Sequence, residues 1–231
     1  MALDPDPRER AERSRAVRRT GRGEQRRQAL LDAALAVFLE QGYERASIEE
    51  VMRRVGGGSK ASLYSYFGSK EGLFWEVLGA QCDRFMQDLA LPTVADDDPG
   101  ATLTAVARRY MRQLGEPASR ELYRIMIAEA PRFPDLARRF YEQGAERVRD
   151  RLGRYLELQH RAGRVVCPEP LLAAMQFFEL LKAPHLRMML GLPPLPRGLS
   201  LDRHLKSAVR IFLYGCANRE VLPPPPPGDR K

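Results

Sequence analysis

The stretch SIEEVMRRVGGGSKASLYSYFGSK, residues 47–70, constrains the fold more than any other part of the chain. Ser47 and Glu50 have the spacing of a capping box, in which each side chain satisfies an unpaired amide of the first helical turn. Apolar residues then recur at helical spacing, and three glycines follow that can turn the chain sharply. Ser59 is a good N-cap for a helix beginning at Lys60. The pattern predicts two short helices joined by a glycine turn.

The second of these helices is too short to persist alone in water, so its stability must come from packing on its neighbours. Its outer face is then left free for a partner. A major groove admits one α-helix, whose first residues reach base edges while flanking groups bind phosphates. We therefore expect a helix-turn-helix that reads DNA. The candidate DNA-binding residues are Ser47, Ser59, Lys60, Ala61, Ser62, Tyr64, Ser65, Tyr66 and Lys70.

The main candidates each have a chemical reason for their assignment. Lys60 can donate to guanine acceptors or to a phosphate, and Ala61 can contact a thymine methyl group. Tyr64 and Tyr66 carry hydroxyls suited to phosphate oxygens, although either ring could instead be half-buried and close a small core. Lys70 follows a serine cap, at a helix end whose dipole favours an anion.

The segment GGGSKAS also contains the residue types of a nucleotide-binding loop. That loop needs adjacent glycine and lysine, an earlier glycine about five positions upstream and a preceding strand. Here Ser59 separates Gly58 from Lys60, and a predicted helix precedes the glycines. The spacing therefore argues against a nucleotide site.

The segment SKASLYSYFGSKEGLF, residues 59–74, resembles the most recognisable segment of the TetR-type bacterial repressors. The resemblance covers residues 26–80 and implies a three-helix DNA-binding head. It also implies that Tyr64 and Lys70 contact the DNA backbone. This sequence departs from the family pattern in one respect, because the turn before Ser59 carries one residue more than is usual and is therefore longer.

The rest of the chain favours an all-α fold. Hydrophobic residues make up 44% of the 231 residues, yet no convincing stretch alternates apolar and polar side chains as a strand would. We expect four parts along the chain. They are a disordered basic arm (residues 1–25), a helix-turn-helix DNA-binding domain (26–72), a helical effector-binding and dimerisation domain (73–222) and a Pro-rich tail (223–231).

Helical spacing predicts a core-facing helix over residues 26–40, ended by Gly42, and a long helix over residues 69–89 that links the two domains. Further helices are expected over residues 101–114, 118–130, 134–161, 170–191 with a kink at Pro184, and from Leu201 to Cys216.

Aromatic and methionine side chains of the large domain offer surface for a small apolar or amphipathic effector. The candidate pocket residues are Phe85, Tyr110, Met111, Tyr123, Met126, Phe177, Phe178 and His185, and the alternative for each is plain core packing. The stretch RIMIAEAPRFPDLARRFYEQG resembles the ligand domain of efflux-type TetR regulators, and this resemblance favours an effector cavity. The family resemblance also implies a homodimer through the last two long helices, which would present two recognition helices to a palindromic double-stranded operator.

The net charge of +8 suits a nucleic-acid partner. The excess of basic side chains lies outside the predicted helix-turn-helix, however, because residues 28–75 hold five basic and six acidic side chains. Three widely spaced cysteines favour reduced thiols and a cytoplasmic location. We expect no signal peptide and no membrane span, since the longest apolar run is short and interrupted by polar residues.

Isolated histidines and scattered carboxylates match no catalytic or metal-binding motif, so we expect neither an enzyme nor a cofactor or bound metal. Three possibilities remain open from the sequence. They are a repressor released by a ligand, a DNA-binding architectural protein without an effector, and a helical small-molecule binder without DNA affinity. Of these we predict the first, a repressor that a small-molecule effector releases from a palindromic operator, with the architectural protein as the alternative.

Overall fold

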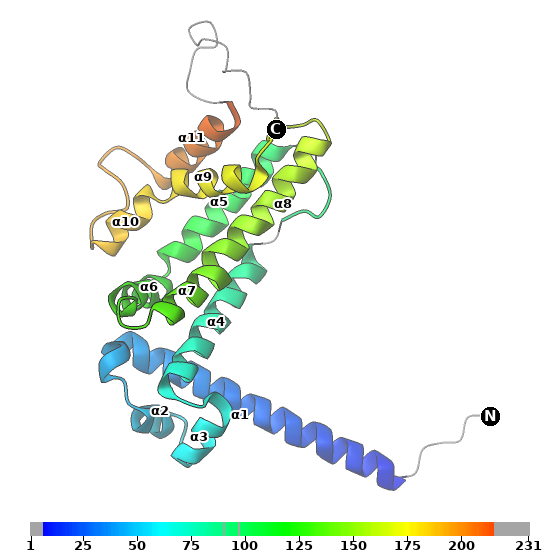
Figure 1. Cartoon of the computed structure of the whole chain (residues 1–231), viewed down its shortest axis with the longest axis vertical. Helices are drawn as coiled ribbons and strands as arrows, with labels where there is room; N and C mark the ends of the chain where they lie inside the picture. Colours follow the sequence, from blue (N-terminus) through cyan, green and yellow to red (C-terminus); the bar gives the residue numbers. More distant parts are fainter. Residues whose placement is uncertain (1–6, 90, 97, 215–231) are drawn as a thin grey trace, which may run out of the picture. The chain divides into compact units, whose positions relative to one another are not determined.

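The structure, a computed structural model, describes residues 7–89, 91–96 and 98–214, and within them every regular element is helical (Figure 1). The predicted all-α class is confirmed. The helices are α1 (Pro7–Arg45), α2 (Ile48–Arg54), α3 (Lys60–Phe67), α4 (Lys70–Asp88), α5 (Pro99–Gly115), α6 (Pro117–Glu129), α7 (Pro134–Tyr141), a π-helical turn η1 (Glu142–Glu146), α8 (Arg147–Arg161), α9 (Pro170–Leu181), α10 (Ala183–Met189) and α11 (Leu201–Tyr214). Cys216 and the predicted Pro-rich tail lie outside the described residues.

The chain forms two compact units. Unit 1 contains the chain up to Arg84 together with Pro117–Gly144, and unit 2 contains Phe85–Glu116 together with the chain from Ala145 onward. Helices α6 and α7 therefore belong with the helix-turn-helix, although the sequence groups them with the effector domain. The division between residues 72 and 73 stays a prediction.

Helix α1 begins much earlier than the sequence predicts. From Pro7 onward the structure shows helix where we expected a disordered arm, and residues 1–6 lie outside the described range. Composition explains the difference, because the segment is rich in arginine and glutamate, which favour helix even without a large apolar face. The predicted break at Gly42 is confirmed, since this residue has φ 74° and interrupts the helical backbone.

The core of unit 1 packs the apolar faces of α1, α2, α3 and α4 together, and α6 closes it with Leu122, Ile125 and Met126. Phe38 and Phe74 meet edge to face, with ring centroids 4.8 Å apart. The Tyr43 ring lies 4.9 Å from Phe74 and 5.4 Å from Phe133. This aromatic cluster joins the end of α1 to the start of α4 and to the loop after α6.

Unit 2 packs α5, α8, α9 and α11 around a second core. Gly153 of α8 lets α9 approach closely, because a Cβ at this position would stand 2.7 Å from the Leu171 side chain. One carboxylate ties the loop before α5 to this core. The Asp96 carboxylate accepts hydrogen bonds from the Tyr155 hydroxyl at 2.9 Å and from Gln159 Nε2 at 3.2 Å.

Two predicted helices are interrupted. The helix expected over residues 134–161 contains the π-helical turn Glu142–Glu146 between α7 and α8. The helix expected over 170–191 is divided at Lys182 into α9 and α10, because Pro184 has no amide hydrogen to continue the helical hydrogen bonds and suits the first turn of a new helix. Within the described ranges, no helix combines the length and apolar character needed to cross a membrane.

Candidate DNA-binding interface

The first helix of the motif, α2, begins as the sequence predicts. Ser47 is its N-cap, and the Ser47 hydroxyl accepts a hydrogen bond from the Glu50 amide at 3.1 Å. The other half of the capping box, in which Glu50 would bond back to the first turn, differs from the prediction. The Glu50 carboxylate accepts instead from the guanidinium groups of Arg53 and Arg54, because two cations on the same helix compete successfully for it.

The glycine turn combines a helix cap with an extended link. The Gly57 amide donates to the Met52 carbonyl at 2.9 Å and the Gly56 amide donates to the Arg53 carbonyl at 3.2 Å, which is the Schellman pattern that ends many helices. Gly56, Gly57 and Gly58 have φ values of 79°, 95° and 120°. These left-handed conformations are open to glycine at little steric cost, so the run of three glycines is required by the turn itself.

The second helix, α3, is the predicted recognition helix. Its N-cap is Ser59, whose hydroxyl accepts from the Ser62 amide at 3.1 Å, and it ends at Gly68. Leu63 and Phe67 are buried against the rest of unit 1, as the spacing predicts. These two anchors fix which face of α3 points outward.

Most of the candidate DNA-binding residues lie on the outer side of unit 1. Ser59, Lys60, Ala61, Tyr64, Ser65 and Tyr66 are exposed, whereas Ser47, Ser62 and Lys70 are half-buried. Tyr64 and Tyr66 expose 42% and 40% of their surface, so neither ring is a closed core residue. The Tyr66 hydroxyl lies against Gly23 of α1, where a Cβ would stand 3.8 Å from it. Their roles toward DNA remain predictions.

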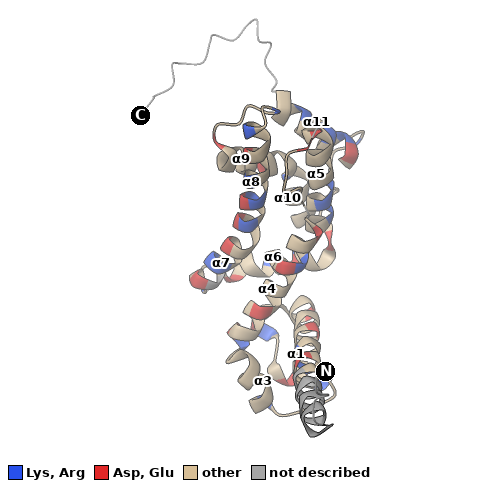
Figure 2. Ribbon diagram, turned by 90° about the vertical axis from the view of Figure 1, so that its right-hand side faces the viewer, with Lys and Arg blue, Asp and Glu red and all other residues tan. Residues whose placement is uncertain are grey.

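The recognition helix carries one charged residue, Lys60, and Figure 2 shows α3 almost free of charge colouring. Lys60 forms an ion pair and a hydrogen bond with the exposed Glu49 carboxylate of α2. This hydrogen bond raises the pKa of Lys60 and lowers the pKa of Glu49. The cation that leads α3 therefore already has an anionic partner next to the glycine turn.

Lys70 is similarly engaged. Its ammonium group donates to the Glu44 carbonyl at 3.0 Å and stands 4.8 Å from the centre of the Tyr43 ring. Partial burial lowers the pKa of Lys70. Lysine has three donors, so a phosphate can still be bound without breaking the bond to Glu44. Neither Glu44 nor Glu49 was singled out from the sequence, because the Glu49 carboxylate meets Lys60 across the turn and the Glu44 carbonyl lies 26 positions from Lys70.

The candidate effector residues do not all gather in one unit. Phe85, Tyr110, Met111, Phe177, Phe178 and His185 belong to unit 2, whereas Tyr123 and Met126 belong to unit 1. Helix α6 turns Met126 into the core shared with α1, and Tyr123 lies exposed beside Phe140. In unit 2 the rings are packed together, with the Tyr110 and Phe178 centroids 4.5 Å apart.

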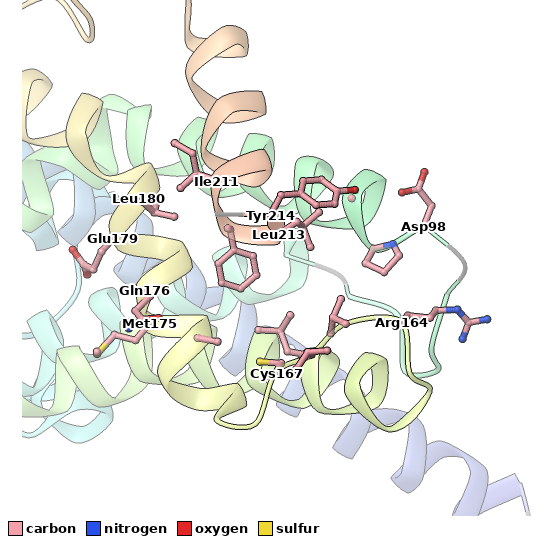
Figure 3. Close-up of a pocket in the computed structure, with 17 residues that line it drawn as sticks. Asp98, Arg164, Cys167, Met175, Gln176, Glu179, Leu180, Ile211, Leu213 and Tyr214 are labelled. Atoms are coloured by element: carbon pink, nitrogen blue, oxygen red, sulfur yellow. The ribbon is translucent and has the colours of Figure 1, made fainter. Parts of the chain in front are cut away.

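Unit 2 has an open groove of about 1180 Å³ that none of the predicted pocket residues lines. Its walls come from the loop before α5, the loop after α8, the outer face of α9 and the end of α11. Figure 3 shows Asp98 and Arg164 at one end of this groove and Glu179 at the other. In the described part of the chain, no three His, Cys, Asp or Glu side chains gather as a metal ion would need.

Both halves of the chain match known families. Residues 30–77 match "Bacterial regulatory proteins, tetR family", and residues 101–216 match "AefR-like transcriptional repressor, C-terminal domain". The HTH-type transcriptional repressor ComR of Escherichia coli (strain K12) is 41% identical over 59 residues, which are 26% of this chain and 28% of ComR. The HTH-type transcriptional activator FasR of Mycolicibacterium smegmatis is 38% identical over 76 residues, which are 32% of this chain and 34% of FasR. These matches span well under two thirds of either relative.

Solved structures resemble the chain over most of its length. A TetR-family transcriptional regulator from Mesorhizobium loti has 30% sequence identity and a TM-score of 0.72, covering 83% of this chain and 96% of that one. The flavonoid-responsive regulator FrrA has 34% identity and a TM-score of 0.69, covering 85% of this chain and 99% of that one. The likeness therefore extends through both compact units.

Proposed function

Since this chain belongs to the TetR family of bacterial transcriptional regulators, we propose that it is a repressor that binds operator DNA through α3 and is released by a small molecule. The observation that carries the proposal is the outward face of α3. Leu63 and Phe67 anchor this helix in the core of unit 1, which leaves Lys60, Ala61 and Tyr64 exposed on a face that can enter a major groove.

The repressor acts as a homodimer through α9, α10 and α11. The support is a broad apolar surface that a monomer would leave in water, because such surfaces mark interaction sites. Its exposed members include Leu171, Leu172, Met175, Leu180, Leu186 and Leu190. The open groove lies on the same α9 and α11 surface, so we assign it to the second copy rather than to the effector. A two-fold dimer would match a palindromic operator.

The effector enters the aromatic core of unit 2. The rings of Phe85, Tyr110, Phe177 and Phe178 form a continuous cluster, with neighbouring centroids 4.5 to 5.8 Å apart. Flat aromatic compounds stack well on such rings, and the similar regulator FrrA is described as flavonoid-responsive. We therefore assign the effector to planar, mainly apolar molecules. Binding must separate rings that are packed in this structure, so the ligand favours a different conformation and shifts the population away from DNA.

The test has two stages. Duplexes bound by the full-length protein are first selected from a random pool, and the proposal expects one palindromic sequence to be enriched. Flavonoids and related planar compounds are then screened for release of that duplex. The variant Phe178→Leu, which removes one ring from the aromatic cluster, is screened alongside the wild type. Enrichment without release by any compound would favour a constitutive DNA-binding protein. A bound complex that raises transcription would favour an activator, as FasR is named.

A further inference from the structure

Arg26 of α1 reaches across unit 1 to the glycine turn. Its guanidinium group donates one hydrogen bond to the Val55 carbonyl at 3.0 Å and another to the Gly57 carbonyl. The two acceptors lie on either side of Gly56, inside the segment that joins α2 to α3. A guanidinium presents several donors in a rigid plane, so one side chain can hold both carbonyls at once.

The turn needs such an external contact because its own hydrogen bonds hold only its first part. The Schellman bonds run from the amides of Gly56 and Gly57 back into α2. Gly57 and Gly58, which have φ values of 95° and 120°, then connect the turn to Ser59. Glycine loses more backbone freedom on ordering than any other residue, so an unsupported run of this kind would leave the direction of α3 loosely defined.

Gly58 shows how closely the guanidinium fits. A Cβ at Gly58 would stand 2.7 Å from Arg26 Nη2 and 2.9 Å from Met52 Cε. The guanidinium therefore fills the place that a side chain would otherwise occupy at this position. Arg26, Met52 and Gly58 form one contact set that joins α1, α2 and the end of the turn.

We propose that Arg26 is a positioning residue for sequence recognition, which sets the direction of α3 by holding the carbonyls of Val55 and Gly57. This inference rests on the proposed DNA-reading function and deepens it. It assigns Arg26 an effect on which sequences are bound, exerted through the turn rather than by contact with DNA. A direct phosphate contact by Arg26 is the competing assignment.

The decisive substitution is Arg26→Lys, which keeps the positive charge but loses the fork that reaches two carbonyls. The matched control is Arg45→Lys, the same change at an exposed arginine of α1 that bonds within its own helix. Full-length proteins are compared on the selected operator and on a scrambled duplex, each over a range of salt concentrations.

We expect Arg26→Lys to lower the ratio of operator affinity to scrambled-duplex affinity about tenfold, because misplacing one good base contact has an effect of this size. The salt slope of binding should stay unchanged. Arg45→Lys should leave the ratio unchanged. The proposal is overturned if Arg26→Lys retains the ratio while Arg26→Ala reduces the salt slope by about 0.9, because that pattern belongs to a phosphate contact.

Hydrogen exchange of the turn separates this inference from the proposed function. In the absence of DNA, Arg26→Lys should speed amide exchange at residues 57–62, whereas the amides of α1 should stay protected. If wild-type protein prefers no duplex, the DNA-reading function fails, and the exchange result still decides whether Arg26 supports the turn. If wild-type protein selects an operator and neither exchange nor ratio changes in the variant, the inference about Arg26 fails alone.

Discussion

Lys60 at the start of α3 is paired with Glu49 at the start of α2, and both side chains remain more than half exposed. The pair places a carboxylate beside the one cation of the recognition helix. A phosphate that approaches Lys60 must therefore displace Glu49 or tolerate its charge. An acceptor in this position suits a base-edge amino group such as that of cytosine better than it suits a phosphate.

Replacing Glu49 by glutamine should make the protein bind DNA more tightly but less selectively. With its partner neutralised, Lys60 becomes available for one more phosphate, so the salt slope should steepen by about 0.9 and affinity for a scrambled duplex should rise about three- to tenfold. Fluorescence anisotropy over a salt series measures both quantities. Glu71→Gln is the matched control, since Glu71 lies in the first turn of α4. Equal effects in the two variants would show that only net charge matters.

Alanine at Lys70 and at Lys60 should have different consequences. Lys70→Ala should weaken operator and scrambled duplexes alike and reduce the salt slope by about 0.9, because the lysine is assigned to a phosphate. Lys60→Ala should weaken the operator more than the scrambled duplex, because this lysine is assigned to base edges as well. The same titrations check both variants. An unchanged salt slope in Lys70→Ala would mean that Lys70 only supports Glu44 and Tyr43.

Acid should destabilise unit 1 partly through Glu50. Hydrogen bonds from Arg53 and Arg54 lower the pKa of Glu50 to about 2, below its ordinary value of 4.5. A lowered carboxyl pKa stabilises the fold above the ordinary value, and this contribution is lost as the pH falls from 4.5 toward 2. Thermal unfolding between pH 7 and about 2 should therefore show a shallower acid decline in Glu50→Gln. Identical profiles for wild type and variant would contradict this assignment.

A charge on the exposed apolar face of α9 should separate the proposed dimer. Met175→Glu should raise the dimer dissociation constant at least about 100-fold, because an unpaired carboxylate cannot be buried in an apolar interface. Sedimentation velocity measures the change, and operator affinity should fall with it. Val94→Glu alters a more exposed apolar residue in the loop before α5 and should leave the dimer intact. A dimer that survives Met175→Glu would place the interface elsewhere.

The partly exposed carboxylate of Asp96 should be essential for the stability of unit 2, because it bonds to buried donors. Asp96→Ala removes the acceptor of Tyr155, Gln159 and Thr102, and Tyr155 and Gln159 are fully buried. Leaving these donors without a partner should lower the free energy of unfolding by about 2–4 kcal/mol, as urea denaturation can measure. Tyr155→Phe removes only one donor and should cost less. Similar losses for both variants would mean that the hydroxyl dominates the cluster.

Features that depend on neighbouring residues were predictable from the sequence. Ser47 and Ser59 cap their helices, Gly42 interrupts α1 and Leu63 with Phe67 forms the buried face of α3, as their spacing predicts. Each of these features is set within about one helical turn, where local backbone geometry decides which groups can meet. The helix-turn-helix could therefore be recognised from a short stretch.

Tertiary structure alone decided which distant groups meet. Arg26 reaches carbonyls 29 and 31 positions away, Glu49 meets Lys60 across the turn, and α6 joins the core of α1 instead of a cavity in unit 2. Helical spacing shows which face of a helix is apolar but leaves open which other face covers it, because many faces of similar width can compete. The sequence by itself thus determined the motif that reads DNA, and packing decided how that motif is held.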